Sequence, residues 1–127
     1  DFDAARLTEL AAIVQSVADQ SVARFPGATA DVQVIAQYRN MAEGLAREPR
    51  AVGLAQAALE RLGRTPRLTI IRGGTDGSRF TELGLPTPNL STGEHNPHSI
   101  LEWTCLEEMQ RAAEMLIELA GLWAVAK

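Results

Sequence analysis

This chain has little cysteine, little positive charge and no long uninterrupted apolar run, and each shortage excludes a class of protein. Cys105 is the one cysteine in 127 residues, which excludes an internal disulfide framework and fits a reducing, cytoplasmic compartment. With a net charge of −4, the chain has no basic surface to recruit nucleic acid or an anionic membrane. The most apolar run, residues 112–127, contains two glutamates and is too short to cross a bilayer. What remains, 46% apolar and 22% charged residues, is the composition of a small soluble globular protein.

The first forty residues predict one helix followed by one strand. Apolar residues recur at three- and four-residue intervals over residues 4–25, with Asp3 as the N-cap and the sequence FPG as the stop. Residues 29–38 then alternate apolar and polar side chains, the pattern of a half-buried strand in an antiparallel sheet. An isolated helix–strand pair cannot cover its own strand edges. Residues 1–41 are therefore expected to be the end of a second domain, and the opening without methionine fits a chain taken from something longer.

Residues 42–127 alternate helices with short apolar strands, and the boundary with the first part falls in residues 40–49. The first expected elements are a helix from Pro49 to Gly63 and a strand over 66–74. A helix over 75–84 and a strand or extended segment over 85–91 follow. The last expected element is a helix from Thr104 to about Ala126, which opens with a Thr104–Glu107 capping box. This alternation predicts a doubly wound α/β sheet.

The sequence IIRGGTDGSRF, residues 70–80, is the first candidate site. Two glycines follow an apolar strand directly, at the strand end where open α/β sheets place their ligands. Arg72 could hold a carboxylate through two hydrogen bonds, and free amides at the helix start attract anions. The alternative is that Asp76 simply caps its helix and Arg72 is a surface cation. Neither GxGxxG nor GxxxxGK[ST] is present, so nucleotide binding is rejected.

The sequence STGEHNPHSILEW, residues 91–103, contains both histidines of the chain and is the second candidate site. His95 and His98 flank an Asn-Pro pair that stiffens the loop, and histidine with carboxylate is a typical set of zinc ligands. Glu102 could orient a liganding imidazole. Two exposed loop histidines without a partner are the alternative, because HxxH in a loop is far less specific than HExxH on a helix.

Three motifs, taken in their order along the chain, relate these two segments to a known family. RGGTDG (72–77), GLPTPN (84–89) and TGxxNxH (92–98) together resemble the C-terminal signature of peptidase T, the tripeptide aminopeptidase, and of its relatives among the di-zinc exopeptidases. The resemblance covers most of the chain. It implies that residues 1–41 end a lid or dimerisation domain, through which two subunits could pair, and that residues 42–127 end the catalytic α/β domain.

The resemblance also implies roles for individual residues. The family binds two zinc ions, and the match makes His98 one metal ligand, with Glu102 beside it and His95 a neighbour that does not ligate. The residues implied to bind the short peptide substrate are Arg72, Gly73, Gly74, Thr75, Asp76 and Asn96. The general base and the other metal ligands of the family would lie upstream, so this chain alone is expected to be inactive.

Two departures from the peptidase T pattern leave the substrate preference open. Glu94 and His95 stand where peptidase T tends to have glycine and an aromatic residue, and an aliphatic residue in SILEW replaces a second histidine. A related amidohydrolase, aminoacylase-like or carboxypeptidase-like, is therefore one alternative. The other is a non-enzymatic α/β module that binds a partner through its first helix and strand edge.

Overall fold

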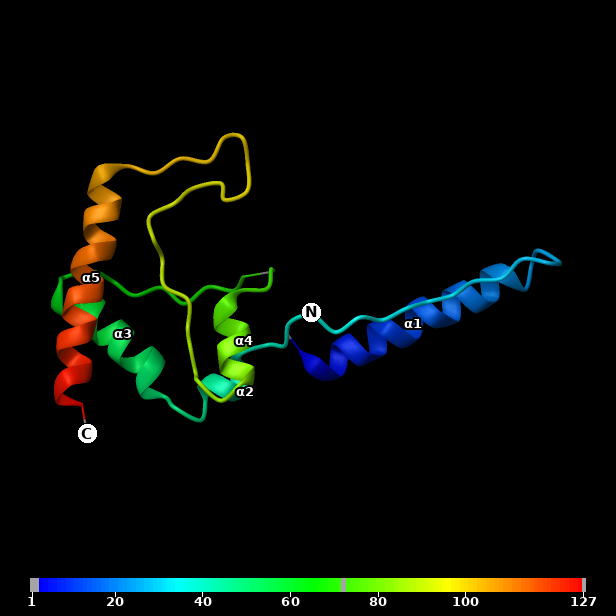
Figure 1. Cartoon of the computed structure of the whole chain (residues 1–127), viewed down its shortest axis with the longest axis horizontal. Helices are drawn as coiled ribbons and strands as arrows, with labels where there is room; N and C mark the ends of the chain where they lie inside the picture. The colour runs from blue at the N-terminus through cyan, green and yellow to red at the C-terminus, as the bar shows by residue number, and fades with distance from the viewer. Residues whose placement is uncertain (1–2, 72, 127) are drawn as a thin grey trace.

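A computed structural model describes residues 3–71 and 73–126. Its helices are α1 (Ala4–Val22), α2 (Ala42–Leu45), α3 (Arg50–Arg61), α4 (Asp76–Glu82) and α5 (Leu106–Val125). Helices α2 to α5 form one body, from which α1 extends as a long arm (Figure 1). The segment between α4 and α5 reaches away from the helices as a loop and returns to the start of α5.

Helix α1 begins where the sequence predicts. The Asp3 side chain accepts hydrogen bonds from the backbone N–H groups of Ala5 (2.8 Å) and Arg6 (3.2 Å), so the predicted N-cap is confirmed. The helix ends at Val22, three residues before the expected stop, because the chain already turns ahead of the Pro-Gly pair. No residue of α1 is buried, so its apolar stripe has no cover within the part of the chain described.

The expected strands do not appear as strands in the described residues. Residues 29–38 and the described parts of 66–74 and 85–91 are irregular, and Val34, Ile35 and Ile70 are at least 70% exposed. A strand is stabilised by its neighbours in a sheet, and those neighbours are not present in residues 3–71 and 73–126. The helical elements of the predicted fold are therefore observed, while the doubly wound sheet stays a prediction.

The core lies between α3 and α5, which pack across one another (Figure 1). Its buried apolar side chains are Ala51, Ala55 and Ala58 from α3 and Met115 and Leu122 from α5. The three alanines lie three or four residues apart and present one smooth stripe, which lets the larger side chains of α5 approach closely.

Polar contacts at the edges of this interface fix how α5 lies on α3. Arg64 donates to the backbone oxygen of Arg111 (2.7 Å) and forms an ion pair with Glu114. One turn further along α5, Glu118 forms an ion pair of 3.1 Å with Arg61, the last residue of α3.

Two predicted helix starts need correction. Pro49 is the N-cap of α3 and not a residue of its first turn. Helix α5 begins at Leu106 after the N-cap Cys105, so the Thr104–Glu107 capping box is wrong. The Thr104 hydroxyl donates instead to the backbone oxygen of Gly93 (2.8 Å), which ties the long loop to the start of α5.

Helix α4 packs on the short helix α2. The buried Thr81 of α4 lies against Gly44 of α2, and a side-chain carbon at Gly44 would overlap the methyl group of Thr81. The same Thr81 hydroxyl accepts the backbone N–H of Thr87 (2.9 Å), so one residue joins α2, α4 and the segment that follows α4.

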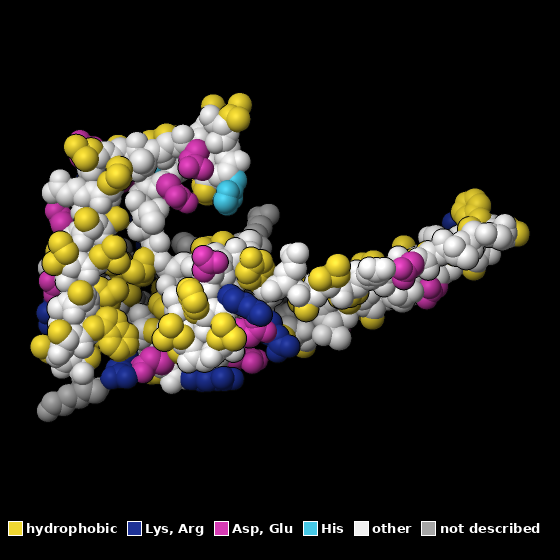
Figure 2. All heavy atoms as spheres, viewed as in Figure 1, with side chains coloured by type: hydrophobic (Ala, Val, Ile, Leu, Met, Phe, Trp, Pro, Cys, Tyr) yellow, Lys and Arg dark blue, Asp and Glu magenta, His cyan; other side chains and the backbone are white. Residues whose placement is uncertain are grey.

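The accessible surface is larger than that of a compact protein of this size. It measures 10185 Å², whereas a compact monomer of 13.7 kDa exposes about 6,600 Å². Figure 2 shows apolar side chains along α1 and over the body formed by the other helices. Among the described helices, none is both long and apolar enough to cross a membrane.

Candidate metal-binding and substrate-binding loops

The first candidate site lies at the start of α4, and Arg72 falls outside the described residues. Thr75 is the N-cap, with an extended backbone and a hydroxyl that accepts from the N–H of Ser78 (3.4 Å). Asp76 is therefore the first helical residue and not the cap that the sequence alternative suggested. Its exposed carboxylate stands in the first turn, where negative charge suits the helix dipole.

The second motif, GLPTPN, folds back onto the first. Asn89 donates a side-chain N–H to the Thr75 hydroxyl (3.1 Å). A side-chain carbon at Gly77 would lie 2.6 Å from the Thr87 backbone oxygen and 2.9 Å from the Asn89 side-chain oxygen. Glycine is therefore required at position 77, because the two motifs touch there.

Residues that precede α2 also reach this site. The ring of Tyr38 packs directly against Gly74, so a larger residue at 74 would displace it. Arg39 pairs with Glu82 of α4 (3.3 Å). Gly73 has open space around it, as a residue that lets a ligand approach the backbone would.

The base of the histidine loop is closed by His95 and Trp103. Their backbones exchange two hydrogen bonds, of 2.8 and 3.1 Å, in an isolated antiparallel bridge. Their rings stack with centroids 4.0 Å apart and planes 11° apart. The Nε2 atom of His95 also lies 2.7 Å from a carboxylate oxygen of Glu108, in the first turn of α5.

The tip of the loop, residues 96–102, holds Asn96 and His98 with left-handed backbones, at φ 51° and 66°. The backbone N–H of His98 donates to the Glu102 carboxylate (2.8 Å), and the Asn96 amide donates to the Leu101 backbone oxygen (3.3 Å). Residues other than glycine adopt this conformation at a cost of ~1 kcal/mol, so the bonds within the tip offset a local strain.

The two histidines differ in their surroundings. His98 is exposed, and its imidazole has no hydrogen-bond partner among the described residues, whereas both the ring face and Nε2 of His95 are engaged. Glu102 contacts the backbone of His98 and not its ring, so the predicted contact with the imidazole stays a prediction. Of the two histidines, His98 is the one whose ring makes no polar or ring contact with the described residues.

The carboxyl group of Glu108 is the ionisable group most affected by the loop. The hydrogen bond from His95 holds the pKa of Glu108 below its usual value of 4.5, with smaller lowering contributions from the charge of His95, the Cys105 thiol and Arg111. Partial desolvation opposes these effects. Glu108 therefore remains a charged partner of His95 at neutral pH.

The described residues contain no group of three or more histidine, cysteine, aspartate or glutamate side chains that could hold a metal ion. A zinc site needs three or four ligands. A zinc site that used His98 would therefore need ligands from outside the described residues.

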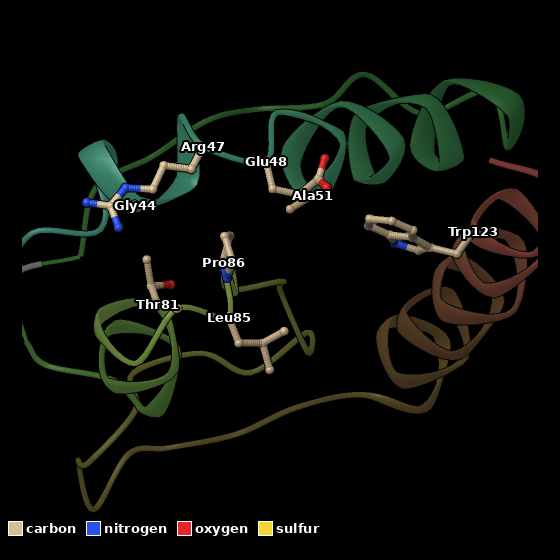
Figure 3. Close-up of a pocket in the computed structure, with 9 residues that line it drawn as sticks. Gly44, Arg47, Glu48, Ala51, Thr81, Leu85, Pro86 and Trp123 are labelled. Carbon is tan, nitrogen blue, oxygen red and sulfur yellow. The ribbon is translucent and has the colours of Figure 1, made fainter. Parts of the chain in front are cut away.

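A separate hollow of about 480 Å³ lies between α2, α3, α4 and α5. The ring of Trp123 points into it from α5, opposite Leu85 and Pro86 from the segment after α4 (Figure 3). Arg47 and Glu48 line its rim, but neither histidine nor any predicted site residue does, so the hollow is not the candidate site.

Comparison with known proteins shows which family of proteins the chain resembles. The chain is 43% identical over 121 residues to peptidase T of Shewanella pealeana. It matches a part of peptidase T. The aligned region is 95% of this chain and 28% of that relative. Peptidase T of Clostridium novyi is 36% identical over 98% of the chain, and that of Streptococcus mutans is 38% identical over 92%. No protein-family model matches the chain.

The chain spans less than a third of the length of these peptidase T relatives, between 28% and 30%. Because the alignments cover 95% and 98% of this chain, they confirm the resemblance seen in the three motifs over nearly its whole length. The comparison does not assign roles to single residues, and those of Arg72, Asn96, His98 and Glu102 remain predictions.

Sequence reasoning missed the residues that build the two loops. Neither Trp103 nor Glu108 could be associated with His95, nor Asn89 with Thr75, because the two members of each pair are 8 to 14 residues apart and irregular backbone lies between them. A usable signal was present for the pair of His95 and Trp103, since aromatic side chains that lie opposite one another across paired backbones often pack together.

Proposed function

We propose that this chain is the C-terminal part of a di-zinc metallo-aminopeptidase of the peptidase T type, which removes the N-terminal residue of short peptides such as tripeptides. The observation that carries the proposal is similarity to peptidase T along nearly the whole chain, combined with a free imidazole held at the tip of a braced loop. The fold proposed with it is the end of a lid domain over residues 1–41 and the end of a doubly wound catalytic domain over 42–127. The uncovered apolar stripe of α1 and the unpaired segments after it support this, since both need further strands to cover them.

Within this proposal, His98 holds one of two zinc ions. Zinc supplies a Lewis acid and a water of lowered pKa when it is bound. The chain's own contribution is positional: the Glu102 carboxylate accepts the backbone N–H of His98, which has a left-handed backbone and an exposed side chain.

The start of α4 is proposed to bind the peptide's terminal carboxylate. Arg72 is the charged partner, and the backbone at Gly73, Gly74, Thr75 and Asp76 lets the substrate approach closely, with Asn96 as a further polar contact. The cap of Thr75 on α4 and the bond from Asn89 support this, because they hold the turn at the start of α4 in one conformation.

Three further statements belong to the proposal. Residues 1–127 alone neither bind zinc tightly nor hydrolyse peptides, because the general base and most ligands lie elsewhere in the whole protein. The lid domain is the surface through which two subunits pair. The compartment is the reducing cytoplasm, which the single cysteine supports.

The test uses the whole protein that carries this chain. Its zinc content should be about two ions per subunit, and tripeptides should be hydrolysed in preference to N-acyl amino acids. His98→Ala should remove about one ion and nearly all activity, while Glu94→Gln, a change at an exposed acid of the same loop, should leave both unchanged. Hydrolysis of N-acyl amino acids alone would assign the protein to an amidohydrolase, and full zinc content in His98→Ala would remove His98 from the site.

A further inference from the structure

We propose that His95 is a positioning residue, which clamps the base of the 96–102 loop to α5 and thereby holds His98 where a metal ion can bind it. The inference rests on the proposed function, in which His98 is a ligand. It gives the second histidine of the chain a distinct task, because His95 acts through the loop backbone and not on the metal.

Three kinds of contact converge on His95. Its backbone pairs with Trp103, its ring stacks on the Trp103 indole, and its Nε2 atom bonds to Glu108. An exposed loop histidine without a task would not satisfy its backbone, its ring face and its ring edge at once. The contacts join the two ends of the loop to each other and both to α5.

The anchor at the α5 end is rigid. Glu108 lies in the first turn of a helix whose Met115 and Leu122 are buried against α3. A second tie runs beside it, from the Thr104 hydroxyl to the Gly93 backbone oxygen. Gly93 itself passes so close to α5 that a side-chain carbon there would lie 2.7 Å from the Glu108 Cβ atom.

The tip depends on this clamp. Asn96 and His98 keep left-handed backbones that residues with side chains rarely adopt, so the surrounding contacts must hold them there. The bonds within the tip, from His98 to Glu102 and from Asn96 to Leu101, connect residues that all lie between His95 and Trp103. They fix the shape of the tip but not its place on the molecule, which the clamp sets together with the tie from Thr104 to Gly93.

The experiment measures metal binding by the whole protein, with zinc and cobalt(II) as the probes. Groups that orient a metal ligand change metal affinity 10- to 100-fold when they are removed. His95→Ala should therefore weaken one of the two sites about tenfold or more. The number of ions at saturating metal should stay the same, and the visible spectrum of the cobalt form should change.

Separate variants test the two ring contacts. His95→Phe keeps an aromatic face for Trp103 but loses the bond to Glu108, and Glu108→Gln weakens that bond from the other side. Both should fall between the unchanged protein and His95→Ala in metal affinity. Glu107→Gln removes the same charge from the same helical turn without touching His95, and should bind metal normally. His95→Tyr, which can stack and also reach the carboxylate through its hydroxyl, should recover most of the affinity.

The outcomes separate this inference from the proposed function. If His98→Ala abolishes one site while His95→Ala and Glu108→Gln bind metal within twofold of the unchanged protein, His95 only stabilises the fold and the inference is overturned. If His98→Ala itself binds both ions normally, the ligand assignment fails and the inference fails with it. If His95→Ala does not fold, His95→Phe and Glu108→Gln decide between the same two results.

Discussion

A single methyl group determines how closely α2 and α4 approach. Gly44 has no side chain, and the Thr81 methyl group occupies the space that one would need. Gly53, in the middle of α3, has open space around it and is exposed. The two helical glycines therefore differ in what they do, one allowing a contact and the other only weakening its helix.

Substituting each glycine by alanine in the whole protein should move stability in opposite directions. Gly44→Ala should destabilise by about 1–3 kcal/mol, because the new methyl group overlaps Thr81. Gly53→Ala should stabilise by about 0.5–1 kcal/mol through helix propensity alone. Urea unfolding measures both changes.

Thr81→Ser provides the control for Gly44→Ala. Serine lacks the methyl group but keeps the hydroxyl that accepts from Thr87, so the double variant should recover most of the lost stability. A double variant as unstable as Gly44→Ala would show that the contact with Thr81 is not the cause.

The carboxyl group of Glu108 makes the stability of the folded protein depend on pH in the acid range. Its pKa is lower in the folded protein than in the unfolded chain, chiefly through the hydrogen bond from His95, so unfolding takes up a proton as the pH approaches 4.5 from above. The stabilising contribution of Glu108 is therefore complete above that pH and is lost as the pH falls through the folded-state pKa.

Acid titration of stability should detect this contribution. The unchanged protein should be more stable than Glu108→Gln at neutral pH, and the difference should shrink steadily below about pH 4.5. Parallel stability curves for the unchanged protein and Glu108→Gln down to low pH would contradict the assignment.

At the scale of elements, the long helices could be predicted from the sequence, whereas the predicted strands do not form among the described residues. A helix satisfies its backbone within its own residues, so the periodicity of 4–25 and the Asp3 cap were sufficient for α1. A strand needs a neighbour, so the alternation in 29–38 does not produce one in this chain. Helix starts were less predictable, since Thr104 bonds to the distant Gly93 in place of its own helix.

The α3–α5 pair offers a comparison between two arginines. Arg64 is the more buried, with 26% of its side chain exposed, and it contacts a carboxylate and a backbone oxygen of α5. Arg61 is 63% exposed and contacts one carboxylate. Exposed ion pairs contribute little, whereas an arginine that also satisfies a backbone oxygen contributes more.

Arg64→Ala should therefore lower the melting temperature of the whole protein clearly, and Arg61→Ala should leave it nearly unchanged. Arg64→Lys should rescue only part of the loss, because an ammonium group cannot reproduce the two-sided geometry of the guanidinium. Equal effects of the two alanine substitutions would show that burial and the Arg111 contact do not matter.

At the scale of the whole molecule, the chain exposes about half as much surface again as a compact protein of its mass. The exposed large apolar side chains lie on α1, α4 and α5 and on the irregular segments.

The candidate site could be predicted from the sequence only in part. Sequence motifs could locate both loops, but the described residues bring no group of three or more possible metal ligands together around His98.

Residues 1–127 produced alone should accordingly behave as an incomplete fold. Their radius of gyration in small-angle scattering should exceed the value of about 14 Å expected for a compact chain of this length, and they should bind the dye ANS strongly. The whole protein should bind little dye. A compact, dye-negative fragment would show that these surfaces need no further cover.

The left-handed backbone at His98 separates what the fold prefers from what the proposed chemistry requires at one position. At φ 66° glycine fits without steric cost, whereas histidine gives up ~1 kcal/mol. In a library randomised at this position, selection for abundance should enrich glycine, and selection for peptide hydrolysis should eliminate it. A lineage released from its substrate would drift toward glycine here, so a natural sequence with glycine at this position would mark a descendant that kept the fold and abandoned the reaction.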